Sequence, residues 1–192
     1  INLAACWAHA RRKFHEAREE CPRQAKWFLH QIGLMYRIER DIRGKGPGLR
    51  RAVRQAGTAM ILARLEKAMK MKLTKHRPTS AMGNAIAYAL GLWSPLLKFR
   101  DDGRLEIDNN GVENAVRPTA LGKKNWLFIG HPEAGQRSAI LYTILECCKR
   151  HGINPQEYLH DVLSRIPAMT NQQTRSLTPA NWLAERRKSR AA

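Results

Sequence analysis

Apolar side chains recur every three or four residues through the first hundred residues of the chain, with charged side chains between them. This spacing places the apolar side chains on one face of a helix. Pro22, the glycine-rich stretch 44–48 and the segment 76–78 interrupt the pattern, because proline and glycine clusters mark loops. Residues 1–100 are therefore predicted to form four helices and no strand. The four apolar faces lie in residues 7–21, 28–42, 49–63 and 82–93.

The middle of the chain has shorter patterns. After a turn at 101–103, residues 105–107 alternate between apolar and polar side chains, which predicts a short strand or an extended segment. Residues 126–129 are all apolar and predict a second short strand or a buried extended link. Between them a helix is expected to begin near Asn110, and Pro118 should end or kink it after about two turns.

Two further helices are predicted toward the C-terminus. The first carries apolar side chains at 140–148 and should end at Gly152, because glycine is favoured just past a helix C-terminus. The second, at 158–166, follows a capping box. Residues 168–178 are polar and predict a loose segment, and the basic residues 185–190 predict a disordered tail.

The chain is strongly basic. Its 192 residues include 34 lysines and arginines against 16 acidic residues, a formal net charge of +18, and the isoelectric point is near 10.5. Basicity of this size favours a nucleic-acid partner over a merely solvated basic surface. The charge is spread along the chain rather than confined to one amphipathic helix, and no apolar run approaches the ~18 residues that span a bilayer, so no membrane role is expected.

The cysteines indicate the compartment. Cys147 and Cys148 are adjacent within an apolar helical pattern, which is typical of free thiols rather than of a disulfide framework. The N-terminal stretch is rich in arginine and lysine and does not resemble a signal peptide. A reducing cytoplasm is therefore the expected location.

Glu113 is the carboxylate on which the functional interpretation depends. Asn110 and Glu113 have the spacing of a capping box, in which the Glu side chain reaches back to the backbone N–H of the cap residue. A carboxylate in the first turn also suits the positive end of the helix dipole. Asn109 or Asn110 can be the cap residue. Spacing alone therefore favours a structural role for Glu113.

Five strings of residues change that interpretation: 6–14, 102–110, 112–118, 121–130 and 178–182. Together they closely resemble the C-terminal half of transposases of the insertion-sequence-sixty-six family. Those transposases are bacterial enzymes with an RNase H-like catalytic domain and an Asp-Asp-Glu metal triad. The resemblance implies a mainly α chain that holds part of an RNase H-like transposase domain, with a helical insertion and few short strands.

The resemblance also implies an order of regions along the chain. Residues 1–100 would be the helical insertion and 101–150 the C-terminal part of the RNase H-like core. Residues 151–183 would form a C-terminal helical element, followed by a basic tail at 184–192.

In the family, the triad Glu lies in the string that contains Glu113, so the resemblance makes Glu113 a catalytic residue and a metal ligand. Such enzymes hold two Mg²⁺ ions between several carboxylates. A single Glu therefore cannot form the metal site by itself. Both triad aspartates of the family precede the string that begins at Cys6, and this chain starts at Ile1. It is therefore expected to be a fragment that lacks them, because Asp101, Asp102 and Asp108 do not match the triad positions.

Basic and amide side chains that follow Glu113 in sequence are the candidate DNA contacts: Arg117, Lys123, Lys124, Asn125 and Arg137. Given the resemblance, they would hold phosphates beside the cleaved bond. Without it, they are a solvated basic face. Where the family often has Arg-Lys-Asn, this chain has Lys-Lys-Asn, which keeps the charge and loses the bidentate geometry of arginine.

Cys6 and His9 have the i, i+3 spacing of one helix face. A zinc site would need two more ligands at suitable spacing, and none is obvious. A similar Cys-x-x-His in RNase H-like transposases is thought to help shape the active site. A small buried Cys beside a surface His explains the pair equally well.

The sequence thus predicts a fragment of a DNA transposase. The intact protein would cleave and join DNA ends by metal-dependent phosphodiester transfer, with Mg²⁺ as cofactor and with DNA, other transposase subunits or accessory proteins of the element as partners. The fragment alone is expected to be inactive. The alternative is a catalytically inactive, basic DNA-binding module from a truncated insertion element. A regulatory protein that dimerises through apolar helix faces lacks the long heptad run it would need.

Overall fold

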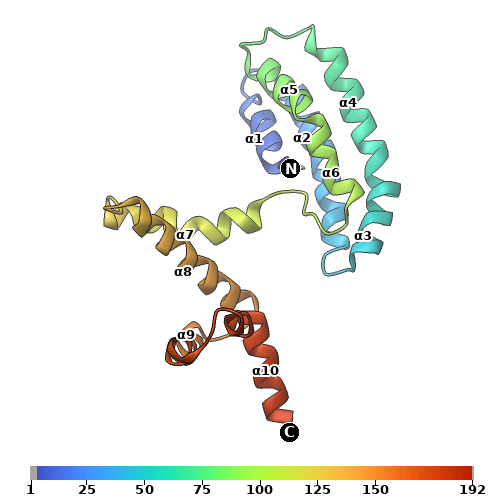
Figure 1. Ribbon diagram of the computed structural model, residues 1–192. Coiled ribbons are helices and arrows are strands. Elements are labelled where there is room, and N and C mark those ends of the chain that lie inside the picture. Colours follow the sequence, from blue (N-terminus) through green and yellow to red (C-terminus); the bar gives the residue numbers. More distant parts are fainter. Residues whose placement is uncertain (1–3, 192) are drawn as a thin grey trace. The chain divides into compact units, whose positions relative to one another are not determined.

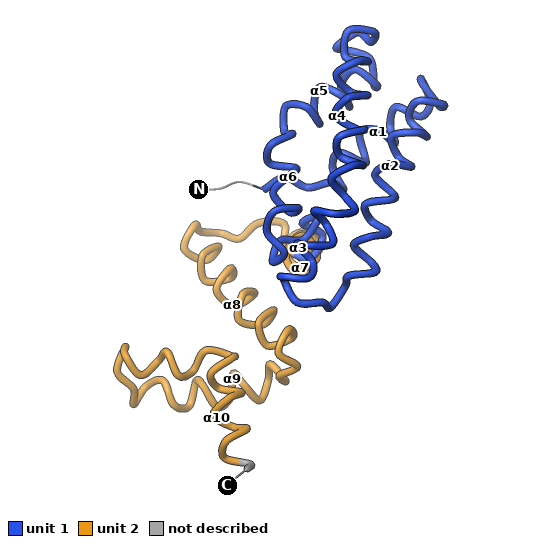
Figure 2. The backbone as a smooth tube through the Cα atoms, turned by 90° about the vertical axis from the view of Figure 1, so that its right-hand side faces the viewer, with its two compact units in different colours: residues 1–111 blue, residues 112–192 orange. Residues whose placement is uncertain are grey.

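The computed structural model describes residues 4–191, with side chains as far as Ser189. Within these residues the chain is mainly helical and contains no strand. It separates into two compact units, residues 1–111 and residues 112–192, which Figure 2 distinguishes by colour. The first three residues of the predicted helical insertion and the last residue of the predicted basic tail lie outside the described residues.

Unit 1 is a bundle of helices (Figure 1) in which α1, α2, α4 and α5 pack on one another. The helices are α1 (Trp7–Glu16), α2 (Pro22–Asp41), α3 (Pro47–Val53), α4 (Ala59–Leu73), α5 (Ala81–Gly91) and α6 (Trp93–Asp101). A π-helical turn, Arg54–Thr58, joins α3 to α4 without a break. The four predicted helices are therefore present, and the last of them is divided at Leu92 into α5 and α6.

The core of unit 1 is formed by the apolar faces of these helices. Trp7 and Phe14 of α1 are almost fully buried. The Trp7 indole N–H donates to the Leu96 carbonyl at 2.9 Å, and the Phe14 ring stacks on Phe28 with 4.5 Å between ring centroids. The three-four spacing of the sequence therefore becomes one continuous apolar interior.

Arg54, the first residue of the π-helical turn, is fully buried. Its Nε and NH2 groups both donate to the Glu39 carboxylate at 2.7 Å, and its NH1 group donates to the Phe99 carbonyl at 2.7 Å. A buried charge is tolerated when it is paired and hydrogen-bonded in this way. The Arg54 side chain thus ties α2 and α6 to the π-helical turn.

Residues 102–108 follow α6 in unit 1, and of the two alternatives predicted for 105–107, a short strand or an extended segment, the strand does not occur. The segment is irregular, with Ile107 buried in the core; the Ile107 carbonyl accepts the Trp7 backbone N–H at 3.2 Å. Gly103 lies so close to the Pro47 carbonyl that a Cβ atom would come within 1.9 Å of its oxygen. Only glycine fits this turn.

Unit 2 contains a smaller core. Its helices are α7 (Asn110–Trp126, which starts at the last two residues of unit 1), α8 (Pro132–Arg150), α9 (Pro155–Arg165) and α10 (Pro179–Ala191), with 3₁₀ turns at Ile166–Ala168 and Gln173–Leu177. Helices α9 and α10 pack on α8. The buried residues are Cys148, Ile153, Tyr158, Val162, Leu177 and Trp182.

The prediction of a disordered basic tail is wrong, because α10 continues through residues 185–190. The helix is anchored by Trp182, which is buried against Tyr158 with 5.4 Å between ring centroids. The Arg186 guanidinium lies over the Trp182 ring at 4.2 Å, and Glu185 pairs with Arg165 at 3.3 Å. Charge composition alone did not reveal these contacts.

Of the two outcomes predicted for Pro118, an end or a kink of the helix, the end does not occur, because α7 continues to Trp126. The prediction for residues 126–129 is wrong. Residues 127–129 form neither a strand nor a buried link: they are irregular and exposed, and Leu127 has a positive φ of 64°. None of the described helices combines the length and the apolar character needed to cross a membrane.

Candidate functional site on helix α7

The start of α7 is fixed by Asp108. The Tyr36 hydroxyl donates to its Oδ2 atom at 2.9 Å, and the backbone N–H of Asn110 donates to its Oδ1 atom at 3.2 Å. The Asn110 side-chain amide adds a third bond to Oδ2 at 3.0 Å. Burial and the neighbouring Asp108 carboxylate both raise the pKa of Tyr36 far above its usual value. Asp108 therefore accepts backbone and side-chain N–H groups, as a cap residue does.

Glu113 is the fourth residue of α7 and is exposed. Because the helix begins at Asn110, the cap position falls on Asn109, and Asn110 lies inside the first turn. Both asparagines are exposed. The Glu113 carboxylate stands near the positive end of the helix, where a negative charge is favoured.

Three charged side chains share one stripe of α7. At 100° per residue, Arg117 and Lys124 lie within about 40° of Glu113 around the helix axis. Lys124 is about 16 Å from Glu113 along the axis, at 1.5 Å per residue. Lys123 and Asn125 flank the end of this stripe, and all five side chains are exposed. The stripe places the candidate carboxylate and two cations on a single face.

Arg137 belongs to α8 and is also exposed. Its NH1 group lies 3.8 Å from the Glu133 carboxylate one turn earlier, in an ion pair that water screens. Such a pair holds the guanidinium weakly and leaves it accessible to a phosphate.

Cys6 and His9 lie in unit 1. Cys6 is at the cap position of α1 without a side-chain capping bond, and both side chains are half-buried. Neither residue belongs to a group of three potential metal ligands in the part of the chain that the structure describes. Cys6 therefore precedes the first helical residue with an extended backbone, and His9 lies in the first turn of α1.

Sequence reasoning missed the role of Tyr36, 72 residues before Asp108. Tyr36 lies on the apolar stripe of α2 and carries no local signal that its hydroxyl meets the start of α7. Only the fold brings the two residues together.

A basic, helical chain with an exposed carboxylate and exposed cations along one helix has the features of a protein that handles nucleic acid. Comparison with known families gives a specific assignment. The model of the transposase IS66 family matches residues 1–137, and the model of the IS66 C-terminal element matches residues 143–180. The chain belongs to the IS66 transposase family, as the sequence motifs indicated.

Three relatives come from Sinorhizobium fredii (strain NBRC 101917 / NGR234), and each is described as an uncharacterized protein. The protein y4jD is 36% identical over 189 residues, which is 96% of this chain and 37% of the relative. The protein y4qI is 38% identical over 167 residues, 86% of this chain and 31% of the relative. The protein y4hP is 31% identical over 195 residues. The chain thus spans about a third of the length of these relatives. No solved structure matches it.

Proposed function

We propose that this chain is the part of a DNA transposase that supplies the last carboxylate of an Asp-Asp-Glu triad and a set of phosphate contacts beside it. The intact protein would carry an RNase H-like catalytic domain and would cleave and join DNA ends by phosphodiester transfer. Glu113 would be the catalytic carboxylate, with the basic residues of α7 and Arg137 as the DNA contacts. Free cysteines are compatible with a cytoplasmic location.

The observation that carries the proposal is the charged stripe on α7 in a member of the IS66 transposase family. Glu113, Arg117 and Lys124 are exposed on one helix face. Metal ions and phosphates are hydrophilic and approach from solvent, so an exposed carboxylate followed by cations suits a site where DNA backbone and metal meet. Binding through Lys and Arg would be electrostatic and tolerant of sequence.

The divalent metals of such a reaction would need carboxylates besides Glu113. Mg²⁺ needs at least one or two carboxylates plus substrate phosphates, and two-metal catalysis needs more. Glu113 belongs to no group of three potential ligands among residues 4–191, and Asp108 is occupied by Tyr36 and Asn110. We therefore expect no metal-dependent nicking by this chain alone. A catalytically inactive DNA-binding module remains the rival function.

The catalytic role is tested by Glu113→Gln in a full-length transposase that contains this segment and two upstream aspartates. Glutamine keeps an oxygen that can accept or bridge hydrogen bonds at a helix start, and the loss of charge costs only about 0.3–1 kcal/mol of dipole interaction. A metal ligand, by contrast, would be lost. We expect transposition to be abolished while thermal stability is nearly unchanged. Transposition at the normal rate would leave Glu113 with a structural role only.

The DNA contacts are tested by Lys123→Ala combined with Lys124→Ala in the 192-residue chain. Each phosphate that a lysine neutralises contributes about −0.9 to the slope of log affinity against log salt. The double variant should therefore flatten the slope by roughly one to two units. A matched control is Lys67→Ala with Lys70→Ala on α4, which removes the same charge from unit 1. Equal loss in both double variants would show non-specific charge rather than a site on α7.

A further inference from the structure

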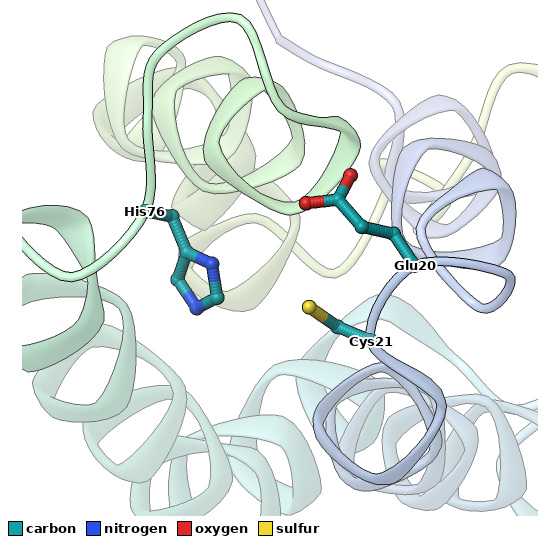
Figure 3. Close-up of side chains that lie close together, drawn as sticks. All are labelled: Glu20, Cys21 and His76. Carbon is teal, nitrogen blue, oxygen red and sulfur yellow. The ribbon is translucent and has the colours of Figure 1, made fainter.

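Three potential metal ligands converge in unit 1, far along the sequence from Glu113. Glu20 and Cys21 lie in the turn between α1 and α2, and His76 lies in the loop between α4 and α5. One ligand atom from each side chain lies within 4.8 Å of the other two. Figure 3 shows the three side chains pointing into the same space, with one ring nitrogen of His76 facing Cys21 and Glu20. No other group of this kind occurs within residues 4–191.

We propose that Glu20, Cys21 and His76 bind a zinc-type transition-metal ion that fastens the α1–α2 turn to the α4–α5 loop. Thiolate, imidazole and carboxylate are the three side-chain ligands that Zn²⁺ takes in proteins. A thiolate and an imidazole are poor ligands for Mg²⁺, which prefers oxygen. Three protein ligands would leave a fourth tetrahedral position for water.

The orientation of His76 fits this role. Its Nε2 atom lies 3.0 Å from the side-chain oxygen Oε1 of Gln24. When Nε2 carries the proton and donates to this oxygen, the other ring nitrogen, Nδ1, presents a lone pair. Metal-binding histidines commonly have their second nitrogen held in this way by a carbonyl or carboxylate. In this tautomer the hydrogen bond to Gln24 holds the direction of the imidazole and leaves Nδ1 for a metal ion.

Glu20 is positioned by a backbone contact and still keeps a ligand atom. Its Oε2 atom accepts the backbone N–H of Ala81, the first residue of α5, at 2.8 Å. The other carboxylate oxygen remains for a metal ion. The same residue thus already links the α1–α2 turn to the start of α5 in the absence of an ion.

The two segments that carry the ligands are internally hydrogen-bonded. The Cys21 backbone N–H donates to Ala17, and its carbonyl accepts from Ala25, both at 2.9 Å. In the His76 loop, the Ser80 hydroxyl donates to the Arg77 carbonyl at 2.8 Å and accepts the Gly83 N–H at 3.0 Å. A Cβ atom on Gly83 would come within 2.0 Å of the Arg77 oxygen, so only glycine allows this loop to pack here.

Metal–ligand bonds are about 2.0–2.3 Å long for nitrogen, oxygen and sulfur on Zn²⁺. Ligand atoms around one tetrahedral ion are therefore about 3.3–3.8 Å apart, and the cluster must contract by about 1 Å when it binds. Glu20 is exposed, while Cys21 and His76 are half-buried. Rotation of these side chains can supply this contraction without movement of the helices.

The test uses the 192-residue chain with Zn²⁺ in equilibrium dialysis and with Co²⁺ as a spectroscopic probe. We expect one tightly held Zn²⁺ per chain, a thiolate-to-cobalt charge-transfer band, and a higher melting temperature in Zn²⁺ because the ion binds the folded state. Cys21→Ser should abolish the cobalt band and the shift in melting temperature. Serine is a better helix cap than cysteine at this position, so loss of folding would not explain the result.

Matched variants separate this site from other thiols and imidazoles. Cys147 is half-buried and His30 is exposed, and neither belongs to the Glu20, Cys21 and His76 cluster. Cys147→Ser and His30→Gln should therefore leave Zn²⁺ binding intact. Gln24→Leu removes the hydrogen bond to His76 without removing a ligand, and should weaken Zn²⁺ binding by about 10–100-fold. The proposal is overturned if the wild-type chain binds no Zn²⁺, or if Cys21→Ser and Cys147→Ser bind it equally.

Discussion

The interiors of the two units differ in size and in what they hold. Unit 1 buries aromatic and aliphatic side chains from α1, α2, α4, α5 and α6, together with the fully buried Arg54. In unit 2, α7 contributes no buried residue and α8 contributes only Cys148. Large apolar side chains of this region, such as Phe128, are instead exposed. The same chain thus contains a packed helical bundle and a long segment with almost no tertiary burial.

The difference separates the scaffold from the candidate chemistry. Glu113 and the candidate DNA contacts stand on α7 and the first part of α8, where burial is least. Helix α7 contains Pro118, two glycines and β-branched residues, all of which lower intrinsic helix stability. Most helix stability in proteins comes from packing of an apolar face. The part of the molecule that carries the proposed DNA contacts is therefore also the part with the least internal stabilisation.

The largest expected contrast is between two phenylalanines. Phe14→Ala removes a ring that is 1% exposed and stacked on Phe28, and should cost about 3–5 kcal/mol of unfolding free energy. Phe128→Ala removes a ring that is 80% exposed and should change stability by less than about 0.5 kcal/mol. Urea unfolding of both variants measures the difference. An equal cost for Phe128→Ala would show that this region is buried in solution and would remove the contrast.

The second prediction concerns the buried charge of unit 1. Arg54→Met removes the donor that pairs with the Glu39 carboxylate at 2.7 Å and leaves it only the more distant Arg50, at 3.7 Å, so it should cost about 3–5 kcal/mol. Arg51→Met, at an exposed position on α3, is the matched control and should be nearly silent. Adding Glu39→Met to Arg54→Met should restore much of the stability, because a buried ion pair can often be replaced by apolar side chains. Urea denaturation of the three variants and the wild type tests this; a double variant no better than Arg54→Met would contradict it.

The sequence predicted the helices because helical periodicity is local. Apolar spacing located α1, α2, α4 and α5, and the Ser80 hydroxyl caps α5 by accepting the Gly83 N–H. The π-helical turn at Arg54 and the pairing of Arg54 with the distant carboxylate of Glu39 were not predicted. A residue pair 15 positions apart on different helices leaves no mark in a three-four pattern.

The predictions of a helix end at Pro118 and of a strand or buried link at residues 126–129 failed because the sequence does not show what surrounds these residues in the fold. Pro118 removes one backbone donor and frees the carbonyl of Asn114, an exposed residue at which water can take the place of the lost partner. The apolar run 126–129 resembled a strand, but a strand needs a partner strand, and none occurs among the described residues. The composition of a segment limits which secondary structures it can form, and the residues that pack around it determine which of them it adopts.

The candidate site was predicted in the same uneven way. Glu113 and the cations after it were identified from motifs, but the helical stripe that joins Glu113, Arg117 and Lys124 exists because α7 continues past Pro118 to Trp126, which the sequence did not predict. The contact between Tyr36 and Asp108 and the cluster of Glu20, Cys21 and His76 depend on residues 72 and 55 or more positions apart. Such contacts require the fold.

The smallest effect on stability is expected from removing one charge in unit 2, that of Asp161. Asp161 accepts the Trp182 indole N–H at 2.7 Å and pairs with Arg165 at 3.3 Å. The hydrogen bond from Trp182, followed by that from Arg165, lowers the pKa of Asp161 below its usual value. A carboxyl group with a lowered folded-state pKa stabilises the fold above its unfolded-state pKa of about 3.9, and this contribution is lost as the pH falls through the folded-state pKa.

Asp161→Asn isolates this charge, because asparagine keeps an oxygen that can accept the Trp182 N–H. At pH 7 the wild-type chain should melt at a slightly higher temperature than Asp161→Asn, and the difference should shrink as the pH is lowered below about 4. Trp182→Phe removes the leading hydrogen bond and should reduce the same pH dependence. Melting temperatures of the three proteins between pH 7 and pH 2 provide the measurement. A difference between wild type and Asp161→Asn that persists at the lowest pH would show that asparagine disturbs the packing of α9 on α10, and that the Asp161 charge does not stabilise the small core of unit 2.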